Sequence, residues 1–187
     1  MSNELNENLP GPRIHAADPA PLLEAAFRRI ETRDMAGVPM LNPALRVEAI
    51  GFTRWQGHWL GILITPWFMN LVIVPGEAAS WRSVAPGKRR FLRFPSGDFA
   101  FLGSEEPEVG EFQCCSLFSP MAQFSDHDSA RKVAFAALAA LQLAPPPAAP
   151  GPANAAPQIA GKKTEQPSVL ERPMSKREFL GGVFRRG

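Results

Sequence analysis

The residues best suited to chemistry in this 187-residue chain are a cluster of carboxylates. Segment 103–111 contains four glutamates and no basic residue. A group of unneutralised carboxylates can bind a basic peptide through charge-assisted hydrogen bonds. We therefore predict that Glu105, Glu106 and Glu108 bind a partner; the alternative is an ordinary solvated hairpin loop.

Two adjacent cysteines, Cys114 and Cys115, follow this cluster. Neighbouring residues of a strand point to opposite faces, and a disulfide between them would strain the backbone, so we expect no bridge. No basic neighbour lowers their pKa, which favours two small buried side chains over reactive thiols. The alternative is a carrier that holds an iron–sulfur cluster with ligands from a second chain, because two thiols cannot complete a tetrahedral site.

Other signs of catalysis are missing from the sequence. His15, His58 and His127 are scattered and match no zinc spacing, and the chain has no glycine-rich phosphate loop and no nucleophile elbow. We predict a protein that is not an enzyme and needs no cofactor or metal.

Charge and hydropathy limit the classes of partner. Residues 1–143 carry 13 basic and 15 acidic side chains, whereas residues 144–187 carry 7 basic and 3 acidic ones. A nucleic-acid binder would place its basic excess on the folded part, so we expect no nucleic-acid partner. No run of about 18 apolar residues and no signal peptide is present, which predicts a cytoplasmic protein without membrane insertion.

Segment 45–76 organises the predicted fold. Runs 47–55, 58–65 and 68–74 are short, apolar and rich in β-branched and aromatic residues, and the breaks between them fit only tight antiparallel turns. The second and third runs are apolar at nearly every position, so both faces of this part of the sheet should be covered.

Further strands are expected at 89–94, 98–102 and 112–118. On the last of these, Phe112, Cys114, Ser116 and Phe118 should share one face, with Cys115 and Leu117 on the other.

Two helices complete the fold. The first should begin at Asp18 and Pro19 and end near residue 35 or 37, and the second should span 126–142 behind a capping pattern of Ser125 and Asp128. The predicted class is α+β, a two-layer sandwich in which an antiparallel sheet of five to six strands packs against an N-terminal and a C-terminal helix.

The domain organisation follows from composition. We predict a disordered N-terminus at 1–17, a domain at 18–143, a disordered Pro/Ala-rich linker at 144–173 and a basic docking motif at 174–187. The linker holds eight of the twenty prolines and no aromatic residue, so it cannot bury enough apolar surface to fold.

The C-terminal motif places an apolar face between basic flanks, which is typical of a short docking helix. It also resembles the Ser-Arg-Arg-x-Phe-Leu core of twin-arginine export signals, with Lys176 in place of the first arginine. At this end of the chain, without a following apolar segment, it cannot act as a signal. It either contacts the partner or occupies the protein's own binding site. The predicted contact residues are Arg177, Phe179, Leu180, Phe184, Arg185 and Arg186.

Aromatic residues around the meander offer a second surface. Trp67, Phe68 and Trp81 could line a groove for an apolar peptide, and the alternative is that they fill the core.

The sequence resembles the NiFe-hydrogenase assembly chaperones of the HybE/HupJ type. The resemblance is carried by Thr65-Pro66-Trp67, by the segment 72–76, by Ser116-Leu117-Phe118-Ser119-Pro120 and by the final Arg185-Arg186. It makes Thr65, Pro66, Trp67, Ser116, Leu117, Ser119 and Pro120 candidate partner-binding residues.

This resemblance implies a non-catalytic cytoplasmic accessory protein. It would hold the hydrogenase small-subunit precursor with its twin-arginine signal, with the large subunit and other maturation proteins as further partners, until metal centres are installed. The alternative that it implies is a factor for iron–sulfur insertion. Cys114-Cys115 and the Pro/Ala tail are not expected across the family, so it assigns neither of them a role.

Overall fold

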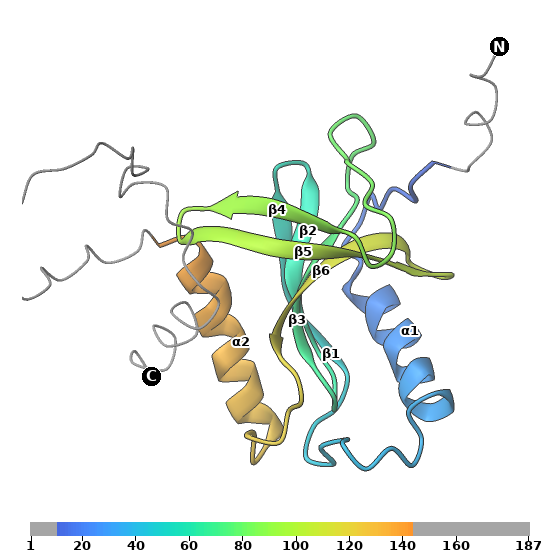
Figure 1. The fold of residues 1–187 in the computed structure, drawn as a ribbon, viewed down its shortest axis with the longest axis vertical. Coiled ribbons are helices and arrows are strands. Elements are labelled where there is room, and N and C mark those ends of the chain that lie inside the picture. Colours follow the sequence, from blue (N-terminus) through green and yellow to red (C-terminus); the bar gives the residue numbers. More distant parts are fainter. Residues whose placement is uncertain (1–10, 144–187) are drawn as a thin grey trace, which may run out of the picture.

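A computed structural model describes residues 11–143 of the chain (Figure 1). Two helices and six strands form in the order α1 (Ala20–Arg33), β1 (Glu48–Trp55), β2 (His58–Ile64), β3 (Met69–Val74), β4 (Arg89–Phe94), β5 (Gly97–Glu106), β6 (Gly110–Phe118) and α2 (His127–Leu141). None of the helices in this part of the chain is long and apolar enough to cross a membrane.

The six strands make one antiparallel sheet with the order β1-β2-β3-β6-β5-β4. The first three strands form the expected meander. Gln56 and Gly57, with φ of 49° and 83°, make the tight turn between β1 and β2, because two-residue hairpin turns with positive φ match the twist of the strands. The predicted α+β class and the antiparallel sheet are confirmed.

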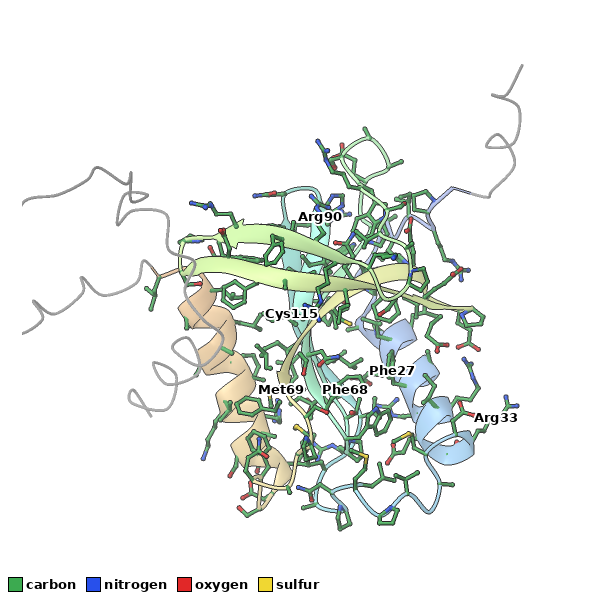
Figure 2. All side chains as sticks on the ribbon, viewed as in Figure 1. Phe27, Arg33, Phe68, Met69, Arg90 and Cys115 are labelled. Atoms are coloured by element: carbon green, nitrogen blue, oxygen red, sulfur yellow. The ribbon has the colours of Figure 1, made fainter. Side chains whose placement is uncertain are left out.

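The two helices cover opposite faces of the sheet. Along β3, Leu71 and Ile73 point into the larger core with α2, whereas Val72 and Val74 point into a second core with α1. Phe68 and Met69 divide in the same way, and Phe68 packs edge-on against Phe27 of α1, with ring centroids 5.8 Å apart (Figure 2). Both faces are therefore covered, as predicted, and the sheet is a middle layer between two helices rather than one of two layers.

Both helix starts differ slightly from the prediction. Helix α1 begins at Ala20, and the Asp18 carboxylate accepts a hydrogen bond from the Ala20 backbone N–H at 2.9 Å. Helix α2 is capped by Asp126, which accepts from the Ser129 N–H at 2.8 Å, and not by Ser125.

Part of the segment that was expected to be disordered is fixed on the sheet. The His15 N–H donates to the Pro75 carbonyl at 2.9 Å, the Trp59 indole donates to the His15 carbonyl at 2.8 Å, and the His15 ring lies 2.9 Å from the Val109 carbonyl. Residues 11–17 are thus an ordered lead into α1; residues 1–10 lie outside the described residues.

A register shift changes the predicted faces of β6. Met69 pairs with Phe118, but the next residue of β3 pairs with Ser116, which leaves Leu117 as an extra residue in β6. Phe118 therefore packs in the larger core, 5.3 Å from the ring of Phe124, and does not share a face with Phe112.

Candidate functional site

An open groove of about 360 Å³ lies at the end of the molecule where α1 finishes and α2 begins, the lower end in Figure 1. The connection between α1 and β1 forms one wall, and the connection between β6 and α2 forms the other. No lining residue carries a charge, and Met40 is 49% exposed. The lining residues are Pro39, Met40, Leu41, Asn42, Pro43, Pro120, Ala122 and Phe124.

Asn42 holds the two walls together. Its backbone N–H donates to the Pro66 carbonyl at 2.9 Å, and its side-chain amide donates to the carbonyls of Met121 at 3.0 Å and Phe124 at 2.8 Å. Through its backbone and its side chain, this one residue joins the α1–β1 connection, the turn after β2 and the segment before α2. Proline-rich connections have few N–H donors of their own. The Asn42 amide supplies hydrogen bonds to these carbonyls and thereby fixes the two walls of the groove relative to each other.

The Thr65-Pro66-Trp67 motif forms a tight turn beside this groove. The buried Thr65 hydroxyl accepts from the Phe68 N–H at 2.9 Å and from the Trp67 N–H at 3.3 Å. The Ser119 hydroxyl in turn donates to the Trp67 carbonyl at 3.4 Å, across 52 residues of sequence. Two of the motifs that carried the family resemblance are therefore neighbours, and Pro120 lines the groove itself.

Known proteins share this architecture and much of this sequence. The model of the family described as "[NiFe]-hydrogenase assembly, chaperone, HybE" matches residues 18–182. The chain belongs to this family.

Individual members support the assignment. The hydrogenase expression/formation protein HupJ of Bradyrhizobium diazoefficiens is 39% identical over 180 residues, 95% of this chain and 97% of that protein. Protein HoxT of Cupriavidus necator is 43% identical over 146 residues, 72% of this chain and 80% of that protein. The solution structure of HybE from Escherichia coli superposes with a TM-score of 0.58 at 27% identity and covers 86% of this chain and 98% of its own.

The acidic segment 103–111 of this HybE-family chain is not the unneutralised cluster that was predicted. Strands β5 and β6 extend into it, and Arg29 of α1 forms ion pairs with Glu108 and, at 3.6 Å, with Glu106. Burial raises the pKa of the Glu106 carboxyl, and Arg29 opposes that rise. The premise that these carboxylates are unneutralised was wrong, because Arg29 of a distant helix supplies the balancing charge. Among Glu105, Glu106 and Glu108, only Glu105 is exposed and forms no ion pair with another residue of 11–143.

The predicted aromatic groove does not form, because its members lie on different faces of the sheet. Trp67 and Phe68 pack with the α1 core, whereas Trp81 is buried in the α2 core and donates its indole N–H to Glu111 at 2.8 Å. Leu117 is likewise a core residue, and Ser116 is a half-buried residue of the β6 ladder. These residues stabilise the HybE-family domain through their packing and do not form a common surface.

The two cysteines point to opposite faces of β6. Cys115 is buried in the α2 core, and Cys114 packs with the α1 core, where burial raises the pKa of its thiol. Within residues 11–143, no three side chains of His, Cys, Asp or Glu gather closely enough to hold a metal ion. The carrier alternative thus obtains no further ligands from the described domain.

The predicted C-terminal motif at 174–187 is not part of the described domain. Arg177, Phe179, Leu180, Phe184, Arg185 and Arg186 lie outside the described residues, although the family match continues to residue 182. The groove, in contrast, was missed by sequence reasoning. Its signal was the proline-flanked run Pro39-Met40-Leu41-Asn42-Pro43, which contributes five of the eight lining residues.

Proposed function

We propose that the groove between the two connections binds an apolar segment of an immature hydrogenase subunit and that the small-subunit precursor with its twin-arginine signal is its principal client. The observation that carries the proposal is the position of two family motifs at one uncharged groove: Pro120 lines it, and the Thr65-Pro66-Trp67 turn beside it is hydrogen-bonded to Ser119 and to the backbone of Asn42. The large subunit is a second client for the same surface. Since such a client would be bound before its export, we propose that the protein acts in the cytoplasm.

The chemistry of the groove favours an apolar client segment. Proline rings and the side chains of Met40, Leu41 and Phe124 offer apolar surface, and Asn42 binds the wall carbonyls of Met121 and Phe124. Methionine adapts its shape to different partners, which suits a chaperone that must accept an incompletely folded chain. The same features support a role in holding a client rather than in catalysis.

The strength of such a complex should be modest. A groove of this size accepts a few apolar side chains, each contributing roughly 1.5–3 kcal/mol on burial before the cost of ordering the client is subtracted. A net free energy near 8 kcal/mol corresponds to a dissociation constant of about 1 μM. That affinity allows release once the client has matured.

A charge placed in the groove tests the proposal. We expect Met40→Glu to weaken capture of the small-subunit precursor at least about tenfold, because a carboxylate would be desolvated by the bound segment. Phe135→Glu is a matched control, since Phe135 is also 49% exposed but lies on α2. Dissociation constants would be measured with purified precursor by fluorescence anisotropy.

Two further arms identify the client. Removal of the signal from the precursor should weaken binding if the signal supplies the apolar segment, and the large-subunit precursor should compete for the same groove. Equal affinity of the Met40→Glu variant, the Phe135→Glu variant and the unmodified protein for both precursors would refute the groove as the binding surface.

A further inference from the structure

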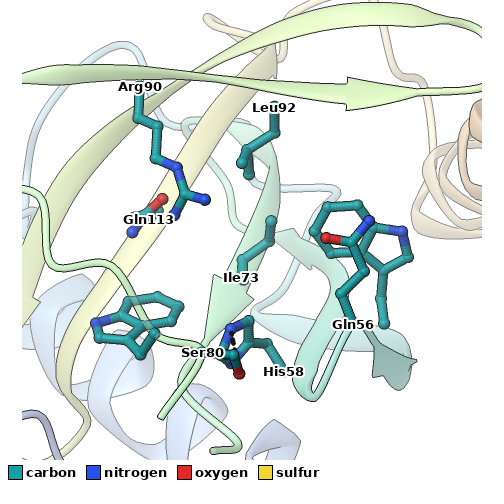
Figure 3. A pocket seen from close by; sticks show the side chains of 9 residues that line it. Gln56, His58, Ile73, Ser80, Arg90, Leu92 and Gln113 are labelled. Atoms are coloured by element: carbon teal, nitrogen blue, oxygen red, sulfur yellow. Dashed lines mark hydrogen bonds between the residues drawn. The ribbon is translucent and has the colours of Figure 1, made fainter. Parts of the chain in front are cut away.

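A second, smaller cavity lies beside the β1–β2 turn, between that turn and β4 (Figure 3). Its volume is about 150 Å³, well below the roughly 300–1,000 Å³ of pockets that take drug-sized molecules. It suits a group about as large as one amino-acid residue. The lining residues are Trp55, Gln56, His58, Ile73, Ser80, Trp81, Arg90, Leu92 and Gln113.

Gln113 presents an unsatisfied acceptor at this cavity. The side chain is only 1% exposed, and its Oε1 atom has no hydrogen-bond partner. Its Nε2 donates to the Arg82 carbonyl at 2.7 Å, and this bond fixes the orientation of the amide, because the flipped amide would place two oxygens against each other. A buried acceptor without a donor is costly, so this position calls for a ligand group that carries an N–H or O–H.

Arg90 brings a positive charge to the same cavity. Its guanidinium points from β4 toward Gln113 (Figure 3), and no carboxylate of residues 11–143 lies within 4 Å of it. Glu77 and Glu111, which approach the cavity walls, accept from Ser80 and Trp81 at 2.8 Å instead. Burial and the nearby Arg82 lower the pKa of Arg90, and an anion beside it would relieve both effects.

His58 and Ser80 form a neutral wall of the cavity. The Gly76 N–H donates to Nδ1 of His58 at 3.4 Å, so Nε2 carries the ring proton and faces the Ser80 hydroxyl at 3.4 Å. That hydroxyl donates to Glu77 and not to the imidazole. In a nucleophile–base pair the hydroxyl donates its proton to the imidazole, whereas here the imidazole N–H faces the hydroxyl oxygen. We therefore interpret this as a binding cavity and not as a hydrolytic site.

We propose that this cavity binds a carboxylate that has an amide N–H on the adjacent carbon, as in an N-acylated amino acid or the last residue of a polypeptide. The carboxylate pairs with Arg90, the amide N–H donates to Oε1 of Gln113, and Trp55 and Trp81 enclose the carbon between them. Guanidinium groups bind carboxylates through paired, charge-assisted hydrogen bonds, which gives the site its selectivity for an acid. The two ligand sources share this chemistry and differ only in the chain that precedes the acyl group.

Three small probes test the proposed chemistry on the full chain. N-acetylglycine carries both groups, N-acetylglycinamide lacks the charge, and acetoxyacetate replaces the N–H by an oxygen. We expect N-acetylglycine to shift the indole N–H signals of Trp55 and Trp81 in nitrogen-15 NMR spectra and to bind at least about tenfold more tightly than either analogue.

Variants separate the cavity from general surface charge. Arg90→Gln should abolish the preference for N-acetylglycine over its amide, whereas Arg89→Gln should keep it, because neighbouring residues of β4 point to opposite faces. Gln113→Met, which keeps the side-chain length, should bind N-acetylglycine and acetoxyacetate equally. Amide spectra of each variant would establish that it is folded.

The length of the peptide probe identifies the source of the ligand. An acetylated tripeptide acid that binds about tenfold more tightly than N-acetylglycine identifies a polypeptide C-terminus, and equal affinity identifies a free acylated amino acid. Equal binding of acid and amide, equal loss in the Arg89→Gln and Arg90→Gln variants, or unchanged spectra with all probes would overturn the proposal and leave a water-filled cavity. None of these outcomes depends on the client groove at the other end of the domain.

Discussion

The indole ring of Trp55 stacks on the phenyl ring of Phe94, with centroids 4.7 Å apart and planes inclined by 18°. Trp55 ends β1 and Phe94 ends β4, the two strands at opposite edges of the six-stranded sheet. The contact exists because the sheet twists until β4 and β5 cross over the first strands (Figure 1). The curled sheet then encloses the larger core on the side of α2.

A double-mutant cycle measures this closure. Phe94 is 3% exposed, so Phe94→Ala should cost roughly 3–5 kcal/mol of unfolding free energy, and Trp55→Ala, at a half-buried position, should cost less. The double variant should lose about 0.5–1.5 kcal/mol less than the sum of the two losses, because the stacking is removed only once. Urea unfolding would provide the values. Additivity within about 0.3 kcal/mol would show that the edges are not energetically joined.

The strands could be predicted from local patterns, and the curl of the sheet could not. Apolar β-branched runs separated by Gln56-Gly57 specify strands and a tight turn through neighbouring residues alone. The pairing of β3 with β6 and the stacking of Trp55 on Phe94 depend on residues that are distant in sequence. The extra residue Leu117 shows the same limit, since a strict alternation along β6 placed Phe118 on the wrong face.

The same reasoning explains why the site was predicted only in part. The Thr-Pro-Trp and Ser-Leu-Phe-Ser-Pro motifs mark the end of the domain where the groove lies, because Trp67 and Ser119 meet there. The cation that balances Glu108 could not be found from the sequence, because no residue near Glu108 indicates that Arg29 of α1 folds beside it. Charge complementarity across 79 residues requires the fold.

A charge swap tests whether Arg29 neutralises the hairpin. Arg29→Glu and Glu108→Lys should each lower the unfolding free energy by less than about 1 kcal/mol, since both side chains are partly exposed. The combined variant should recover most of that loss. Glu105→Lys is the control and should change stability little. If the combined variant loses as much as the two single variants together, Arg29 and Glu108 do not interact.

The buried His58 should make stability depend on pH. Burial lowers the pKa of its imidazole, so the unfolded chain binds the proton more tightly than the folded one. Stability should therefore fall as pH drops below the unfolded pKa of about 6.5. His58→Asn keeps an acceptor for the Gly76 N–H but does not titrate, and it should show a smaller loss between neutral and acidic pH in urea unfolding. Identical slopes in the two proteins would show that another group controls this pH range.

The positions of the cysteines predict slow thiol chemistry. Cys115 is 7% exposed, and the thiol of Cys114 has a raised pKa, so both should react slowly with iodoacetamide near pH 7.5 and rapidly in urea. The variant with both cysteines changed to alanine should capture the small-subunit precursor as the unmodified protein does. Iron and visible absorbance in anaerobically purified protein, lost in that variant, would instead favour the cluster-insertion alternative.

The C-terminal motif should compete with the client for the groove. From residue 143 to Phe179 the chain can span at most about 3.3–3.6 Å per residue, which is ample to reach either end of the domain. A tethered apolar segment such as Phe179-Leu180 acts at millimolar effective concentration, so deletion of residues 174–187 should raise the affinity for the precursor severalfold. Anisotropy with the signal-bearing precursor would measure it, and Phe179→Glu with Leu180→Glu, which preserves chain length, should have the same effect. A lower affinity in both variants would mean that the motif contacts the client directly, because removal of a competitor can only strengthen binding.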